Sequence, residues 1–277
     1  MRDGRPSFTA SVVSLARGLA GDPCAERLLP GPLSAVLRVL RGASVLPLGA
    51  ATVSIVTGGV PDHIALRTAE IDDAVRSATR DGIEQVVILG AGLDARAYRM
   101  QELRDAVVLE VDHAATQEFK RSRVVRLRPE AKEVRFVAVD FERDTLSAAL
   151  EQAGHRTDAR TLFIWEGVTP YLEPSAIRAT LTRLATRSAS GSRLVMTYVT
   201  PEMTTFPVAP RLVHAAFGII GERLRGAMSP ELAAAEMESA GFRVVSDTSP
   251  AAWARARRHP RPWALVVSER LAIAVRD

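Results

Sequence analysis

Apolar and polar positions alternate in two different rhythms along the chain after about residue 66. Short apolar runs, rich in β-branched residues, predict buried strands at residues 85–89, 107–111, 134–139, 161–165, 193–198, 241–245 and 263–267. Most of the stretches between them have apolar positions at helical spacing, which predicts helices at residues 66–81, 114–127, 144–153, 174–188 and 230–240. Apolar strands that alternate with amphipathic helices are typical of a parallel sheet covered on both faces. A ligand of such a sheet binds beyond the C-terminal ends of its strands.

Two regions depart from this rhythm. Residues 7–60 contain helical stretches at Thr9–Leu19 and Leu33–Leu40, and they are too short for a second enzyme domain. We interpret residues 1–65 as an N-terminal helical cap on a domain formed by residues 66–277. Within that domain, residues 200–226 contain three prolines before an apolar helical stretch, and we interpret them as a lid inserted after a strand.

Composition narrows the class of protein. The chain has 277 residues, of which 47% are hydrophobic and 25% charged, as in an ordinary globular protein. No apolar run approaches the roughly 20 residues that span a bilayer, and the N-terminal sequence does not resemble a signal peptide. Cys24 is the single cysteine, so a disulfide within the chain is excluded. We therefore expect a cytoplasmic protein with no membrane partner.

The charge balance is mildly basic. The formal net charge is +4, and arginine dominates because Lys120 and Lys132 are the only lysines. The densest basic stretch, residues 255–261, could contact a phosphate or a nucleic acid, but it has no interleaved aromatic residues. A solvated loop is the favoured interpretation. We expect no nucleic-acid partner, and the sequence is compatible with a homodimer without indicating one.

The strongest local signal is the turn Gly90-Ala91-Gly92-Leu93-Asp94, which follows a predicted strand and precedes a predicted helix. Its pattern, G-x-G-x-x-A, would also suit a dinucleotide. Asp94 argues against a pyrophosphate, since two like charges about 4–5 Å apart cost on the order of 3–4 kcal/mol at an effective dielectric near 20. The ammonium and sulfonium groups of S-adenosylmethionine would instead attract this carboxylate. The alternative is that Asp94 caps the following helix, and both roles can coexist.

Acidic residues also follow the next two strands. Glu110 and Asp112 lie on the same face of their strand, and either could accept hydrogen bonds from ribose hydroxyls. We favour Asp112, and a solvated carboxylate remains the alternative. Asp140 and Phe141 end the third strand, where a carboxylate could accept from an adenine amino group and a ring could pack on the base.

These features occur together, in an order that resembles the leucine carboxyl methyltransferase family. The resemblance covers roughly residues 6–270 and is closest to the bacterial branch of S-adenosylmethionine-dependent and polyketide O-methyltransferases. The matching segments are Arg67 with Ile71-Asp72-Asp73, Leu89–Arg99, Glu110–His113, Val139–Phe141 and Trp165–Leu172.

The resemblance implies a fold and a set of roles. The fold would be a Rossmann-like class I methyltransferase sheet, mostly parallel with an antiparallel last strand, under a helical cap. The family's pattern assigns the cofactor carboxylate to Arg67, the methionine end to Glu166 and the substrate side to Tyr171. It also supports Asp112 at the ribose and Asp140-Phe141 at the adenine. The chain departs from the pattern at Ala95, where the family usually has Thr, and at Phe8, where the branch often has Arg.

Residue chemistry alone supports some of these roles. A bidentate guanidinium at Arg67 suits a carboxylate, although a solvated helical arginine is equally compatible. Glu166 follows an apolar strand, where a buried carboxylate needs a partner such as an ammonium or a nearby arginine.

The donor is already activated, so transfer can depend mainly on alignment of the acceptor oxygen with the methyl carbon. A carboxylate acceptor needs no base, whereas a phenol would benefit from one. His214 in the predicted lid and His63 are the candidate bases, although either could be a packing or surface histidine. Tyr171 and Tyr198 could bind the acceptor through their hydroxyls, and core packing is the alternative for Tyr198.

The sequence therefore predicts an S-adenosylmethionine-dependent O-methyltransferase that acts on a carboxylate or hydroxyl of a small molecule, such as a polyketide-type natural product. Two alternatives remain open: an NAD(P)-dependent oxidoreductase on a similar sheet, and a non-catalytic cofactor-binding protein. Methylation of nucleic acid is less favoured, because no acidic or amide motif with aromatic neighbours is present for an extruded base. We assign no metal ligands.

Overall fold

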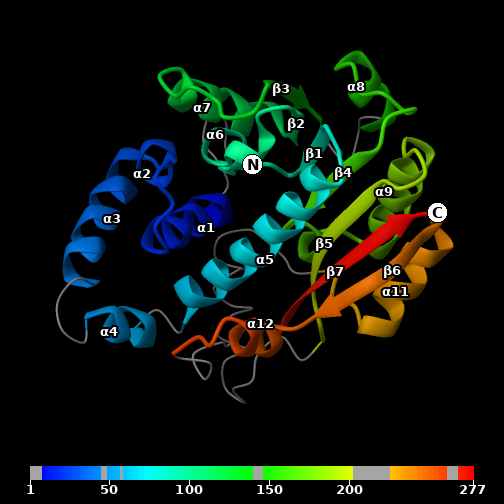
Figure 1. Ribbon diagram of the computed structural model, residues 1–277. Helices are drawn as coiled ribbons and strands as arrows, with labels where there is room; N and C mark the ends of the chain where they lie inside the picture. Colours follow the sequence, from blue (N-terminus) through cyan, green and yellow to red (C-terminus); the bar gives the residue numbers. More distant parts are fainter. Residues whose placement is uncertain (1–7, 45–48, 57–58, 140–145, 202–224, 261–267) are drawn as a thin grey trace.

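A mostly parallel sheet lies at the centre of the protein (Figure 1). The computed structural model describes residues 8–44, 49–56, 59–139, 146–201, 225–260 and 268–277. These residues build a seven-stranded sheet in the order β3-β2-β1-β4-β5-β7-β6. The strands are β1 Gln85–Leu89, β2 Val107–Asp112, β3 Glu133–Ala138, β4 Thr161–Trp165, β5 Arg193–Val199, β6 Phe242–Thr248 and β7 Glu269–Arg276.

The last strand in the sequence runs against its neighbours. β7 pairs antiparallel with β5 and with β6, whereas the pairs among β1 to β5 are parallel. Glu269, the first residue of β7, therefore pairs with Val199 at the end of β5. This reversal places Glu269 beside the carboxyl ends of the parallel strands.

Apolar side chains cover both faces of the sheet. In β1, Val86 and Ile88 enter one core and Val87 and Leu89 enter the other, as expected for a strand buried on both sides. Helices that contribute to the first core are α5 Val60–Arg80, α6 Arg96–Arg99, α7 Ala114–Val124 and α12 Pro250–Ala256. Helices of the second core are α8 Leu146–Gln152, α9 Pro174–Thr186 and α11 Pro230–Ser239. Short 3₁₀ turns, η1 Gln101–Leu103 and η2 Thr169–Tyr171, complete the described elements of this part.

Helices from the N-terminal part of the chain lie beside the sheet (blue in Figure 1). They are α1 Phe8–Leu19, α2 Ala25–Leu28, α3 Gly31–Ser44 and α4 Gly49–Val56. Ala25, Leu29 and Leu37 form a small core of their own among α2 and α3. The predicted boundary at residue 65 falls inside α5, so the division into cap and domain stays a prediction.

Outside the predicted lid, each strand and helix predicted before residue 263 overlaps an observed one, but α5 begins at Val60 and not at residue 66, and α2, α4 and α12 were not predicted. The strand predicted at residues 263–267 lies outside the described residues, and the strand that closes the sheet is β7, Glu269–Arg276. β7 was not predicted from the sequence, because the charged residues Glu269, Arg270 and Arg276 flank its apolar run and leave only residues 271–275 in that run. The predicted lid falls largely on residues 202–224, which are also outside the described part.

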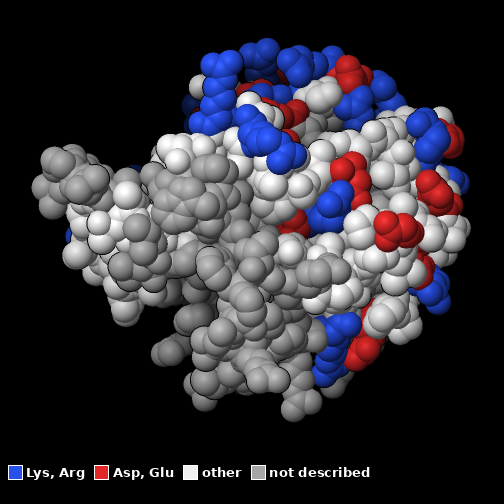
Figure 2. Space-filling model, turned by 90° about the horizontal axis from the view of Figure 1, so that it is seen from below, with Lys and Arg blue, Asp and Glu red and all other residues white. Residues whose placement is uncertain are grey.

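The surface carries both signs of charge (Figure 2). In the basic stretch after α12, the Nε of Arg257 donates to Glu70 of α5 at 2.8 Å, and Arg257 also pairs with Asp73. Arg257 therefore ties this stretch to α5, which differs from both the solvated loop and the phosphate contact that the sequence suggested. Among the described helices, none is long and apolar enough to cross a membrane.

Candidate cofactor site

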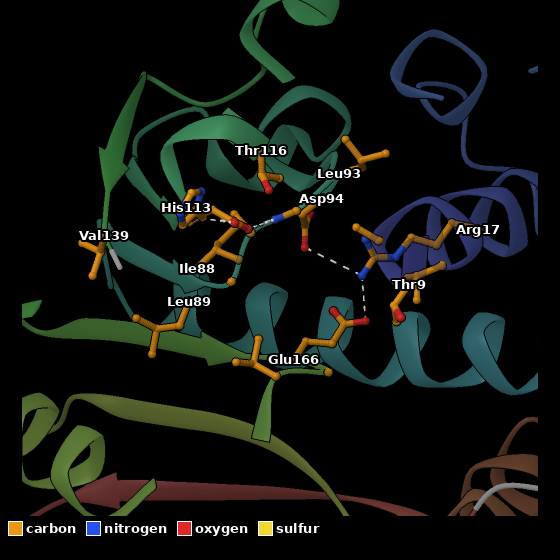
Figure 3. A pocket seen from close by; sticks show the side chains of 18 of the residues that line it. Thr9, Arg17, Ile88, Leu89, Leu93, Asp94, His113, Thr116, Val139 and Glu166 are labelled. Carbon is orange, nitrogen blue, oxygen red and sulfur yellow. Dashed lines mark hydrogen bonds and ion pairs between the residues drawn. The ribbon is translucent and has the colours of Figure 1, made fainter. Parts of the chain in front are cut away.

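A cavity of about 300 Å³ opens at the carboxyl ends of β1, β2 and β4 (Figure 3). This volume lies at the lower end of the range of about 300–1,000 Å³ that is usual for small-molecule sites. The N-terminal helix α1 forms one wall and contributes Thr9 and Arg17 (Figure 3). The rest of the cavity is lined mainly by residues of the sheet and of the segments that follow its strands. They are Arg67, Ile88, Leu89, Gly90, Ala91, Gly92, Leu93, Asp94, Asp112, His113, Thr116, Val139, Glu166, Gly167 and Val168.

The turn after β1 forms the floor of the cavity. Gly90 and Gly92 have φ angles of 65° and 48°, a left-handed conformation that favours glycine. A Cβ on Gly90 would lie 2.2 Å from Cγ2 of Val168, so a side chain there would collide with the turn after β4. The two glycines thus let the backbone bend sharply and keep this part of the cavity open. Gly90, Ala91 and Gly92 all line the cavity, where the sequence predicted them.

Asp112 lines the cavity at the tip of β2. Its Oδ2 accepts a hydrogen bond of 2.6 Å from the amide of Gly92, and its Oδ1 accepts one of 2.7 Å from the amide of His113. Burial raises the pKa of Asp112, although these two amides act in the opposite direction. The amides fix the orientation of the carboxylate, and a carboxylate has further lone pairs with which it can accept hydroxyl donors.

Glu110 lies deeper along the same strand and does not line the cavity. Its carboxylate lies 2.6 Å from Nζ of Lys120 on α7, and both side chains are 1% exposed. Burial raises the pKa of Glu110, while Lys120 lowers it in part. Of the two acidic residues that the sequence left open for a ribose, the geometry therefore supports Asp112.

Three arginines converge on Glu166 at the opposite side of the cavity. Oε1 of Glu166 lies 2.6 Å from Nη2 of Arg17 and accepts from Nε of Arg67 at 2.9 Å. Its Oε2 accepts from Nη1 of Arg96 at 2.8 Å. Burial alone would raise the pKa of Glu166, but Arg17, Arg96 and Arg67 hold it well below its usual range. Glu166 is thus an ionised carboxylate, partnered by the arginines that sequence analysis named as one option.

Asp94 makes a local bond at the start of α6 and also belongs to the cavity wall. Its Oδ1 accepts from the backbone amide of Arg96 at 2.8 Å, although the N-cap of α6 is Ala95 and not Asp94. Its Oδ2 pairs with the Arg96 side chain and lies 3.8 Å from Nη2 of Arg17 (Figure 3). Burial raises its pKa, but Arg96 and Arg17 outweigh that effect, and the pKa is lowered. Asp94 therefore stays charged in the cavity wall.

Sequence analysis missed Arg17 and Arg96. Arg96 belongs to the glycine-turn motif, so the sequence could place it near the site. The sequence could not predict which side chains it contacts. Arg17 was part of a correctly predicted helix, but nothing in its local sequence shows that α1 packs beside the ends of the strands. Arg17 faces the cavity between Asp94 and Glu166 (Figure 3).

The residues predicted for the acceptor side are more scattered. The hydroxyl of Tyr171 in η2 donates to Oγ1 of Thr9 at 3.5 Å, and Tyr171 does not itself line the cavity. Tyr198 is buried, and its hydroxyl donates to Asp247 at 2.5 Å. His63 is buried against Glu269. Predictions for His214, Asp140 and Phe141 fall outside the described residues.

The strand order, the reversed β7 and a glycine turn under a cavity define a class I methyltransferase fold, so the predicted fold class is confirmed. Two solved structures share this fold. A DUF574 family protein from Streptomyces avermitilis superposes with a TM-score of 0.65 at 14% identity, covering 99% of both chains. A Thermobifida fusca protein described as a "putative methyltransferase" gives a TM-score of 0.63 at 17% identity, covering 99% of this chain and 96% of that one.

Similarity in sequence identifies the family of the chain, which the shared fold alone does not. Residues 8–185 match the profile of the leucine carboxyl methyltransferase family, and the chain belongs to that family. A Mycobacterium marinum protein named "Putative S-adenosyl-L-methionine-dependent methyltransferase" is 39% identical over 206 residues, which cover 72% of this chain and 67% of that protein. The family predicted from the sequence motifs is thereby confirmed.

Proposed function

We propose that this protein transfers a methyl group from S-adenosylmethionine to an oxygen of a small molecule, either a carboxylate or a hydroxyl. The observation that carries the proposal is the chemical difference between the two ends of the cavity. One end presents Asp112, whose carboxylate can accept paired hydroxyl donors. The other presents guanidinium groups together with an ionised glutamate, Glu166.

The residues present fit such a cofactor. Ribose hydroxyls would be held by Asp112, and the amino-acid end by the cluster around Glu166. A zwitterion needs a cation for its carboxylate and an anion for its ammonium, and Arg67 and Glu166 supply both within 2.9 Å of each other. Asp140 and Phe141 remain proposed for the adenine, because they directly follow in sequence Val139, which lines the cavity.

The same geometry disfavours a dinucleotide. In a dinucleotide site the amides of the glycine turn face a pyrophosphate. Here the amide of Gly92 donates to Asp112, and the ionised Asp94 lines the same turn. A pyrophosphate would compete with one carboxylate for that amide and would be repelled by both.

The bound cofactor would supply an electrophilic methyl group, so the protein's task is to align the acceptor and to exclude water. Glu166 and Arg67 would hold the amino-acid end of the cofactor and so help to fix the position of the sulfonium that carries the methyl group. We propose that Tyr171, held by Thr9 of α1, lies on the acceptor side, and that His214 is the base when the acceptor is a phenol. Tyr198 is a weaker candidate for acceptor binding, because its hydroxyl already has Asp247 as a partner.

The acceptor class is the finer part of the proposal. We infer a small molecule, such as a polyketide-type acid or phenol, and a cytoplasmic site of action. The branch resemblance supports the acceptor class. The single cysteine, Cys24, which is buried and unpaired, is compatible with a reducing compartment.

The direct test is methyl transfer. The purified protein is incubated with S-adenosylmethionine carrying a labelled methyl group and with separate panels of aromatic acids, phenols and aliphatic acids. We expect label in one panel and a loss of that transfer in Asp112→Asn. If no compound in any panel becomes labelled although the protein binds the cofactor, the result would support the non-catalytic alternative instead.

A further inference from the structure

A buried network behind the cavity contains two residues, His63 and Glu269, that the proposed function does not use. His63 and Arg67 are four residues apart on α5, so they lie on one face of that helix. Both point at Glu269, the first residue of β7. Exposed fractions are 2% for His63, 5% for Arg67 and 3% for Glu269.

Arg67 is held at two places. Its Nη1 donates to both carboxylate oxygens of Glu269, at 3.0 and 2.8 Å. Its other edge faces the cavity, with Nε and Nη2 each 2.9 Å from Oε1 of Glu166. Glu166 lines the cavity and Glu269 does not. The guanidinium therefore presents one edge to the cavity and is anchored by the other.

Glu269 is ionised in this network. Burial alone would raise its pKa, but Arg67 and His63 lower the pKa to about 2. Nε2 of His63 lies 2.7 Å from Oε2 of Glu269, and Nδ1 of His63 has no hydrogen-bond partner among the described residues. Within the described part of the chain, the imidazole therefore makes its one polar contact with Glu269, at a carboxylate oxygen that Arg67 also contacts.

We propose that Glu269, oriented by His63, is the positioning residue that aims Arg67 at the carboxylate of the cofactor. Because β7 runs antiparallel, its first residue reaches the edge of the sheet where the ligand binds. A ligand carboxylate can take the cavity edge of Arg67 from Glu166 while Glu269 keeps the far edge in place. Glu269 and His63 do not touch the cofactor in this arrangement, and they act through Arg67.

This inference rests on the proposed function, and a matched pair of ligands separates the two. S-Adenosylhomocysteine has the amino-acid end that Arg67 would hold, and 5′-methylthioadenosine has the same nucleoside without it. Calorimetry with both ligands is carried out on wild type, Glu269→Gln, His63→Phe and His63→Gln. Glu102→Gln is the control, because Glu102 is an exposed carboxylate that also pairs with an arginine, Arg76.

We expect Glu269→Gln to bind S-adenosylhomocysteine about 10- to 100-fold more weakly, the range for loss of a charge-assisted bond. Its affinity for 5′-methylthioadenosine should stay that of wild type. His63→Phe should show a smaller loss for the first ligand only, and His63→Gln should recover it, because its amide can donate to Glu269.

Equal losses for both ligands, or none in Glu269→Gln, would overturn the positioning role. If Glu269→Gln does not fold, the two His63 variants decide in the same way. A wild-type protein that binds neither ligand would instead contradict the proposed function.

Discussion

Arg17 of α1 and Glu166 at the end of β4 lie 2.6 Å apart, from Nη2 to Oε1, and both line the same cavity. This ion pair joins the first described helix of the chain to the centre of the sheet. The side chains of Arg17 and Glu166 are 8% and 6% exposed, so little solvent screens the interaction. Helix α1 is therefore part of the wall of the cavity.

The first prediction concerns Arg17. Replacing it with methionine keeps much of the side-chain volume and removes the guanidinium from the cavity wall. We expect Arg17→Met to bind S-adenosylhomocysteine about tenfold or more weakly, the size of one lost charge-assisted hydrogen bond. Arg27→Met is the matched control, since Arg27 is exposed on the neighbouring helix α2. Equal affinities in both variants would show that Arg17 has no part in binding.

The second prediction separates two acidic residues of one strand. Asp112→Asn should weaken the binding of S-adenosylhomocysteine and of 5′-methylthioadenosine alike, because both ligands carry the ribose. Glu110→Gln should leave the affinity of the folded protein unchanged but lower the free energy of unfolding by about 3–5 kcal/mol, because Lys120 stays buried without its counter-charge. Urea denaturation and calorimetry on both variants measure the two effects.

A compensating change tests the cause of that loss. Glu110→Gln combined with Lys120→Met removes both charges, so most of the lost stability should return. A double variant as unstable as the single one would contradict the buried ion pair as the cause.

The third prediction concerns the glycine turn. Gly90→Ala places a Cβ against Val168 at a φ of 65°, and the left-handed backbone alone costs about 1–2 kcal/mol for a residue with a side chain. We expect lower stability and loss of cofactor binding. Gly42→Ala is the contrast: Gly42 lies in α3 with open space around its Cα, so stability should rise by about 0.5–1 kcal/mol. Thermal unfolding of both variants tests the contrast.

The fourth prediction is a pH dependence far from the cavity. Burial, and then the nearby Arg187, lower the pKa of His155 to about 4. An unfolded histidine has a pKa of about 6.5, so between the two values the unfolded chain binds more protons and stability rises with pH. The contribution of His155 is complete above about pH 6.5 and is lost as the pH falls towards 4, by up to about 3 kcal/mol.

The matched variant for this effect is His155→Gln, which keeps a polar side chain near Thr161 and Phe163. Urea unfolding at several pH values should give a smaller loss of stability below pH 6.5 in the variant than in wild type. Parallel curves for the two proteins would show that His155 is not the group responsible.

Local pattern was enough to predict most of the fold. Strands buried on both faces, such as β1, are continuous apolar runs, and the glycine turn after β1 has a composition that few other structures require. β7 escaped because Glu269 and Arg270 at its start are engaged by Arg67 and Asp247, partners distant in sequence. From the sequence alone, charged residues that pair with each other in the folded protein cannot be distinguished from charged residues that face solvent.

The site was predictable where a residue belongs to a motif and unpredictable where it depends on packing. Asp112 and Glu110 share a face of β2, so periodicity could not separate them, and Lys120 of α7 makes the difference in the structure. Arg17 reaches the cavity because α1 packs beside the sheet, a contact that no local pattern encodes. Glu166 was predicted because it belongs to a motif, but the sequence did not predict that three arginines contact it.

The central claim is that the turn Gly90–Asp94 receives an adenosyl ligand that carries an ammonium group and no phosphate. Isothermal titration of the wild-type protein with S-adenosylhomocysteine, and separately with NAD⁺, tests it most directly. The account predicts saturable binding of the first ligand, strongly weakened in Asp112→Asn, and no binding of the second. Binding of NAD⁺ at this turn, or a heat signal for S-adenosylhomocysteine that Asp112→Asn leaves unchanged, would contradict it.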